Sequence, residues 1–230
     1  MAKDVYLVGW PGAGKAELES ELSALGYQVE AGHALAWYDT DKPVWALVDC
    51  RTRVEDKQAL KTLLNAGDVL VLMFWHHVGL DDQAWWLAQC RELVADKPYL
   101  LKASQPLSAE RVANLLAAAK TAQNPNWPQV AVWELDLPYR VVLQHAMFVL
   151  EGARQQMPGR LWRVRWTCQT QEYVNPVVID MTPSRFEAEA ANEQDVIGRI
   201  RIVGEGVDQP QVQQQFHEWF RACIAPGQTD

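Results

Sequence analysis

Three glycines and a lysine near the start of the chain have the types and the spacing that phosphate binding requires. The stretch runs Gly9-Trp-Pro-Gly-Ala-Gly-Lys-Ala16, between an apolar segment and a helix-like one. Glycines let backbone N–H groups turn towards an anion, the following helix adds its partial positive charge, and a lysine adds a full one. The spacing Gly9-x4-Gly14-Lys15 therefore predicts a phosphate-binding loop formed by Gly9, Gly12, Ala13, Gly14, Lys15 and Ala16.

The position after Lys15 departs from this pattern. A complete loop carries Ser or Thr there, whose hydroxyl holds Mg²⁺, and this chain has Ala16, whose methyl group cannot ligate a metal. Asp49 ends a predicted strand at the sheet edge where ligands bind, which makes it the candidate Mg²⁺ ligand, acting through water. The alternative is a tight strand-to-helix turn of an ordinary α/β protein, with Lys15 a solvated lysine.

The elements that must position this loop alternate through the first half of the chain. Strands are expected at Val5–Val8, Tyr27–Glu30, Val44–Val48, Asp68–Trp75 and Tyr99–Lys102, and helices at Ala16–Leu25, Glu55–Asn65, Asp81–Val94 and from a Ser108 cap to Lys120. Apolar strands alternating with helices predict a parallel sheet covered on both faces. His33–Asp41 is expected to be loop, with Gly67 a helix C-cap, and Thr121–Pro128, rich in proline and asparagine, a linker.

The second half has a different order of expected strands and helices. Strands are expected at Gln129–Leu135, Leu161–Gln169, Val174–Met181 and Ile197–Val203, helices from Pro138 to Arg154 and at Gln211–Ile224, and a loose polar excursion at Glu187–Asp195. Alternating strands beside helices predict an antiparallel sheet with helices on one face. Arg160, Arg163 and Arg165 form either a basic face or ion pairs with acids across the sheet.

Composition limits the partners and the location. The net charge of −8 argues against non-specific nucleic-acid binding. No apolar run is long enough to span a bilayer, and the start of the chain lacks a signal-peptide pattern, so no membrane partner and a cytoplasmic location are expected. The four cysteines contain no C-x-x-C pair, which favours reduced, mostly buried thiols.

Both halves, in this order, resemble the CobW-like family of P-loop GTPases and metallochaperones. The segments that carry the resemblance are the loop Gly9–Ala16, the strand Val44–Asp49, Asp68–Leu72 before the family's guanine motif, and the C-terminal segments Gly159–Trp166 and Arg199–Asp208. The resemblance implies an α/β P-loop NTPase-like domain, residues 1–122, followed by a smaller CobW C-terminal-like α+β domain, residues 129–230. It also implies GTP or ATP as the bound nucleotide, with Mg²⁺.

The departures from the family pattern bear on activity. Met73-Phe-Trp-His76 stands where the family has its guanine-reading N-K-x-D, and none of these residues supplies the carboxylate. The C-x-C-C and E-x-S-G segments are absent, and Lys15 to Val44 is too short for the family's switch and metal regions.

We therefore expect a shortened, degenerate relative that binds a nucleotide, with weak or absent hydrolysis. One alternative is a non-catalytic pseudo-GTPase module that binds a protein partner and no nucleotide. Another is a metal carrier that uses histidines, with zinc held by His33, His76 and Cys50.

Overall fold

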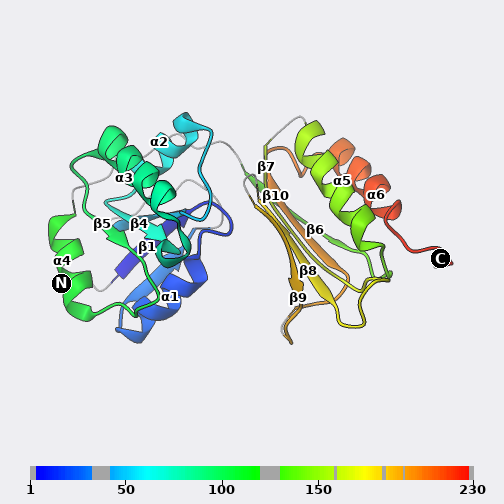
Figure 1. Ribbon diagram of the computed structural model, residues 1–230, viewed down its shortest axis with the longest axis horizontal. Coiled ribbons are helices and arrows are strands. Elements are labelled where there is room, and N and C mark those ends of the chain that lie inside the picture. Colours follow the sequence, from blue (N-terminus) through cyan, green and yellow to red (C-terminus); the bar gives the residue numbers. More distant parts are fainter. Residues whose placement is uncertain are drawn as a thin grey trace. The chain divides into compact units, whose positions relative to one another are not determined.

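A computed structural model describes residues 4–32, 42–119, 130–157, 160–182, 185–193 and 195–227. The chain divides into two compact units, Met1–Pro128 and Gln129–Asp230, each with its own sheet and its own core (Figure 1). The loop expected at His33–Asp41 and the linker expected at Thr121–Pro128 lie outside the described residues.

Unit 1 is built on a parallel sheet, as the alternation of strands and helices predicted. Its elements are β1 (Asp4–Gly9), α1 (Lys15–Ala24), β2 (Gln28–Ala31), β3 (Val44–Asp49), α2 (Lys57–Ala66), β4 (Val69–Met73), the 3₁₀ turn η1 (Trp75–His77), α3 (Leu80–Val94), β5 (Tyr99–Leu101) and α4 (Ala109–Ala118). The five strands lie in the order β2-β1-β3-β4-β5, and all pairs are parallel. The carboxyl ends of all five strands therefore share one edge of the sheet, and the loop after β1 lies at this edge.

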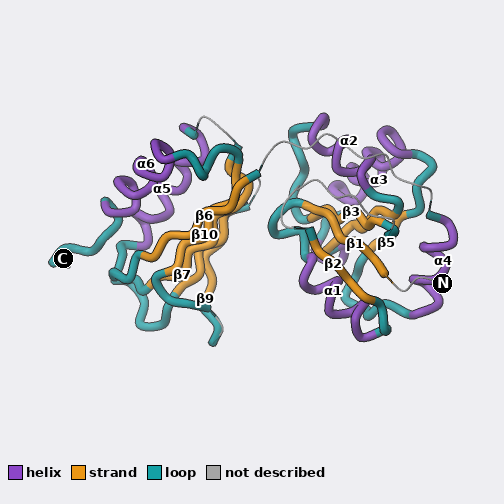
Figure 2. The backbone as a smooth tube through the Cα atoms, turned by 180° about the vertical axis from the view of Figure 1, so that it is seen from behind, coloured by secondary structure: helices purple, strands orange, loops and turns teal. Residues whose placement is uncertain are grey.

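Helices cover both faces of this sheet, with α1 on one side and α2 and α3 on the other (Figure 2). Leu18 and Leu22 of α1 pack with Val112 of α4 against alternate strand residues such as Leu7 and Leu47. The strands β3 and β4 are buried along almost their whole length, which explains their continuous apolar sequences.

Unit 2 is an antiparallel sheet with its two helices on one face (Figure 1). Its elements are β6 (Ala131–Asp136), α5 (Leu143–Gln156), β7 (Leu161–Cys168), β8 (Val177–Met181), β9 (Phe186–Ala190), β10 (Arg199–Gly204) and α6 (Pro210–Arg221). The strand order is β6-β10-β7-β8-β9. Phe216 and Phe220 of α6 and Leu150 of α5 pack on Trp166 and Ile202 of the sheet to form the core.

Two expectations for unit 2 were wrong. Part of the segment expected to be a loose excursion, 187–190, belongs to the strand β9, which pairs with β8 at the edge of the sheet. An edge strand with an exposed side tolerates polar residues, so polarity did not exclude it. The helix expected from Pro138 begins only at Leu143, because Val141 forms β-bridges with Thr170 and Ile224.

Two helix caps agree with the sequence analysis. The Ser108 side chain accepts a hydrogen bond from the Arg111 N–H and caps α4, as expected. Gly67 is the C-cap of α2, as expected, with an extended backbone. All four cysteines are buried, as expected. Among the described residues, no helix combines the length and the apolar character needed to cross a bilayer.

Candidate functional site

The loop between β1 and α1 contains a hydrogen-bonded turn and two glycines in the left-handed conformation. The Ala13 N–H donates to the Trp10 carbonyl at 3.1 Å and closes a turn, and the Leu18 N–H donates to the Gly14 carbonyl at 3.1 Å in the first turn of α1. Gly12 and Gly14 have φ of +87° and +80°, in the left-handed region that side chains with a Cβ rarely adopt. The chain therefore turns sharply from strand to helix directly before Lys15.

Close packing also requires glycine at two of these positions. A Cβ at Gly9 would lie 2.8 Å from the Leu47 carbonyl of β3. A Cβ at Gly14 would lie 2.6 Å from the Met73 Cε and 3.0 Å from the Phe74 Cζ, at the end of β4. The loop is thus held closely against the ends of two neighbouring strands.

Lys15 folds back across this loop. Its Nζ donates to the Gly9 carbonyl at 2.8 Å and to the Gly32 carbonyl, just after β2, at 3.0 Å. The two carbonyls place an ammonium group near the N-terminus of α1, where a positive charge is otherwise unfavourable. An anion at the loop would meet both the helix N-terminus and this charge. Ala16 is exposed.

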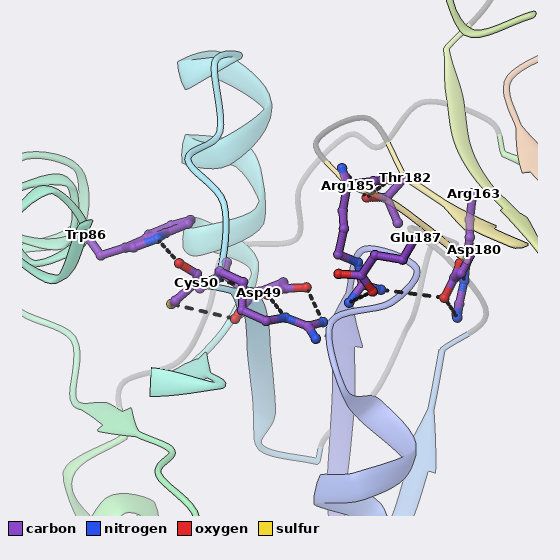
Figure 3. Close-up of polar contacts among 10 residues, drawn as sticks. Asp49, Cys50, Trp86, Arg163, Asp180, Thr182, Arg185 and Glu187 are labelled. Carbon is purple, nitrogen blue, oxygen red and sulfur yellow. Dashed lines mark hydrogen bonds and ion pairs between the residues drawn. The ribbon is translucent and has the colours of Figure 1, made fainter. Parts of the chain in front are cut away.

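Asp49 lies at the end of β3 and is bound by a neighbouring arginine (Figure 3). The Arg51 Nε donates to Oδ1 at 2.9 Å and its Nη2 to Oδ2 at 2.7 Å, and the Arg51 N–H also donates to Oδ1 at 3.0 Å. The Arg51 guanidinium stacks on the Phe74 ring, with its Cζ 3.8 Å from the ring centroid. Contacts thus run from Asp49 through Arg51 and Phe74 to Gly14 of the loop.

The described residues do not fit the Mg²⁺ ion that the family resemblance implies. Mg²⁺ takes oxygen ligands, yet the side chain of Ala16 offers none and both carboxylate oxygens of Asp49 accept from Arg51. In the described ranges, no three His, Cys, Asp or Glu side chains gather in a way that could hold a metal ion. Asp49 as a metal ligand stays a prediction, and it would require Arg51 to move away.

The candidate zinc ligands are not brought together among the described residues. Cys50 is buried, and burial raises the pKa of its thiol, whereas zinc binds the thiolate. The Cys50 carbonyl accepts a hydrogen bond from the Trp86 indole at 3.0 Å (Figure 3). His76 is exposed in η1, with its ring centroid 3.9 Å from that of His77. His33 lies outside the described residues.

A buried ion pair that the sequence analysis missed fixes the loop after β5. Lys102 is 2% exposed, and its Nζ lies 2.9 Å from the Glu21 Oε1 of α1. The same Nζ donates to the carbonyls of Ala103 and Gln105, and Glu21 Oε2 accepts from the Leu107 N–H. The ion pair and these hydrogen bonds therefore hold residues 103–107 against α1, the helix that begins at Lys15. A lysine directly after an apolar strand was the only sequence signal.

Two of the three candidate arginines of unit 2, Arg163 and Arg165, are paired with acids, as one of the two alternatives predicted. Arg163 binds the Asp180 carboxylate with two hydrogen bonds of 2.8 and 2.6 Å (Figure 3). Arg165 donates to Asp195 at 2.8 Å, and this hydrogen bond holds the pKa of Asp195 below its usual value. Arg160 stacks on an indole, with its Cζ 4.7 Å from the centroid of the Trp162 ring.

Comparison with known proteins gives only a distant likeness. No family model matches the chain, and no curated protein matches it. The Zn(II)-bound YjiA GTPase from E. coli is 11% identical, with a TM-score of 0.35, over 94% of this chain and 98% of that one. A Zn(II)-bound triple mutant of YjiA GTPase is also 11% identical, with a TM-score of 0.35, over 92% of this chain and 68% of that one. A likeness this weak does not assign residue roles, so the candidate site is described from the contacts within this chain.

Proposed function

We propose that unit 1 binds the phosphate chain of a nucleotide, GTP or ATP, at the loop Gly9–Ala16, with weak or absent hydrolysis. We also propose that the chain is a shortened relative of the CobW-like metal-handling GTPases, on the segments named in the sequence analysis. The observation that carries the proposal is the Lys15 ammonium, hydrogen-bonded across the loop to Gly9 and Gly32 beside the N-terminus of α1. Together, the ammonium and the backbone N–H groups of a helix start form an anion site.

We expect weak or absent hydrolysis because the loop has no side chain that could hold Mg²⁺. Phosphoryl transfer needs a metal ion or an equivalent charge to stabilise the transition state, and the loop lacks the hydroxyl that would hold Mg²⁺. The side chains after β4 are Phe74 and Trp75, so no carboxylate there can read a guanine base. The bound nucleotide is then selected mainly through its phosphates, and GTP and ATP should bind with similar affinity.

The second candidate is a pseudo-GTPase module that binds a protein partner and no nucleotide. The observations that favour it are the methyl group of Ala16 and the Arg51 side chain that engages both oxygens of Asp49. In this case the loop would be a structural turn, and the hydrogen bonds of Lys15 to the Gly9 and Gly32 carbonyls would serve to hold that turn.

Calorimetric titration with GTP, GDP and ATP, each with and without Mg²⁺, separates the two candidates. We expect Lys15→Ala to weaken binding roughly ten- to hundredfold, the range for losing one charge-assisted hydrogen bond. Lys61→Ala, at an exposed position on α2, is the matched control and should bind like the wild type. An absence of heat with every nucleotide would refute nucleotide binding and leave the pseudo-GTPase module.

A further inference from the structure

The contacts at the ends of β3 and β4 place a second positive charge beside the phosphate-binding loop. We propose that Arg51 is the second cation of this site and binds phosphate oxygens in place of Mg²⁺, and that Asp49 positions Arg51 instead of holding a metal ion. This inference rests on the proposed function, because it assigns the charges that the bound phosphate chain meets.

Arg51 is fixed in direction by two different partners. Asp49 holds the Nε and Nη2 side of the guanidinium with hydrogen bonds of 2.9 and 2.7 Å, and Phe74 supports its face with the ring centroid 3.8 Å from Cζ. Both members of the ion pair are partly buried, with side-chain exposures of 26% for Arg51 and 21% for Asp49. A side chain held at one edge and on one face has already lost much of its conformational freedom, so binding an anion costs it little more.

The same contacts place Arg51 beside the loop. The Phe74 ring on which it stacks packs against Gly14, where a Cβ would lie 3.0 Å from the ring's Cζ. Lys15, in contrast, points across the loop towards Gly32 after β2. Lys15 therefore reaches the residue after β2, whereas Arg51 stacks on the residue after β4 that packs against Gly14.

The chemistry of the two side chains suits a phosphate chain that lacks a metal ion. A nucleoside di- or triphosphate carries several negative charges, which Mg²⁺ normally shares with a lysine. Arginine keeps its charge at all physiological pH values, and its planar set of N–H donors matches the spacing of phosphate oxygens. An arginine oriented by Asp49 can therefore supply N–H donors to phosphate oxygens at a loop where Ala16 cannot hold a metal ion.

The test measures affinity for three probes with the full chain: GTP, ATP and inorganic triphosphate, each in EDTA and in Mg²⁺. We expect the wild type to bind all three without needing Mg²⁺, and Arg51→Ala to weaken each by roughly tenfold or more. Arg53→Ala is the matched control, because Arg53 lies two positions further on and pairs with Asp82 at 2.6 Å. Arg51→Lys keeps the charge but loses the planar donors, so it should restore part of the affinity.

Asp49→Asn identifies the role of the carboxylate. If Asp49 positions Arg51, this variant weakens binding equally in EDTA and in Mg²⁺, and adding Asp49→Asn to Arg51→Ala causes little further loss. Binding that requires Mg²⁺ and is lost in Asp49→Asn but kept in Arg51→Ala would overturn the inference and make Asp49 the metal ligand.

Two other results refute the inference in distinguishable ways. Affinity that is unchanged or improved in Arg51→Ala, while Lys15→Ala abolishes binding, would show that Arg51 only fills space beside the loop, and the proposed function would stand. Failure of the wild type to bind any probe would overturn both proposals. Circular dichroism of each variant confirms that the fold is kept before affinities are compared.

Discussion

Replacing Glu21 by alanine tests whether the buried ion pair with Lys102 fastens α1 to the loop after β5. The substitution would leave an ammonium group that is 2% exposed and that, among the described residues, keeps the Ala103 and Gln105 carbonyls as hydrogen-bond acceptors. It would also remove the acceptor of the Leu107 N–H.

The expected loss is large because only one member of the pair is removed. Breaking a buried ion pair in this way typically costs about 3–5 kcal/mol. Glu21 itself is 23% exposed and Lys102 keeps two carbonyls, so we expect the low end, about 3 kcal/mol. This corresponds to roughly a hundredfold faster hydrogen exchange in the parts of unit 1 that open through global unfolding.

The assay is hydrogen exchange of the full chain, read on peptides from α1 and β5, together with urea unfolding. Glu21→Gln keeps an acceptor for the Leu107 N–H and should lose less stability than Glu21→Ala. The double variant Glu21→Ala/Lys102→Met removes both charges and should recover much of the loss. Purely additive losses in the double variant would show that the two side chains do not stabilise unit 1 as a pair, and would refute the reasoning.

Further substitutions and treatments test the packing of the loop, a buried lysine and the cysteines. Gly14→Ala places a Cβ 2.6 Å from the Met73 Cε on a backbone with φ of +80°. The free energy of unfolding, measured by thermal unfolding, should therefore fall by roughly 1–3 kcal/mol. Unchanged stability would contradict the close packing. Lys97→Ala removes hydrogen bonds to three carbonyls at and after the end of α2 and should cost about 1–3 kcal/mol in urea unfolding, whereas the exposed Lys57→Ala should cost little. Burial raises the pKa of Cys90 to about 11 and of Cys168 and Cys223 to about 12, so a thiol reagent at pH 8 should label the unfolded chain and not the folded one. Because these folded-state pKa values lie above the ordinary pKa of a thiol, the same thiols should make the free energy of unfolding fall as pH rises from about 9 towards 12, and it should fall by less in Cys168→Ala.

The sheet of unit 1 and its loop could be predicted from sequence because several local signals agreed. Continuous apolar strands, helix-like segments between them and the glycine spacing all pointed to the same arrangement. The boundaries were shifted by a few residues; β4, for example, ends at Met73 rather than Trp75. Phe74 takes a left-handed conformation there, with φ of 59°, and no sequence signal marks this turn.

The side-chain contacts around the candidate site could not be predicted from the sequence. Arg51 stands two positions after Asp49, but a spacing of two does not reveal that its side chain turns back to the carboxylate and stacks on Phe74, which follows the neighbouring strand β4. Glu21 and Lys102 are separated by most of the sequence of unit 1, and their ion pair depends on how the chain after β5 reaches α1. Contacts of this kind arise from tertiary structure, and no periodic pattern in the chain encodes them.

Both outer strands of the antiparallel sheet of unit 2 carry two acids each, and this has a consequence for solubility. Glu134 and Asp136 lie on β6, and Glu187 and Glu189 lie on β9, at the opposite edge. Exposed sheet edges can pair with the edges of other copies and start aggregation. Pairing between two such edges would crowd carboxylates of two molecules, and it would compete with the ion pairs that Asp136, Glu134 and Glu187 form with Arg199, Arg201 and Arg185. The chain should therefore be less prone to edge-to-edge association than a variant in which these four side chains are replaced by alanine.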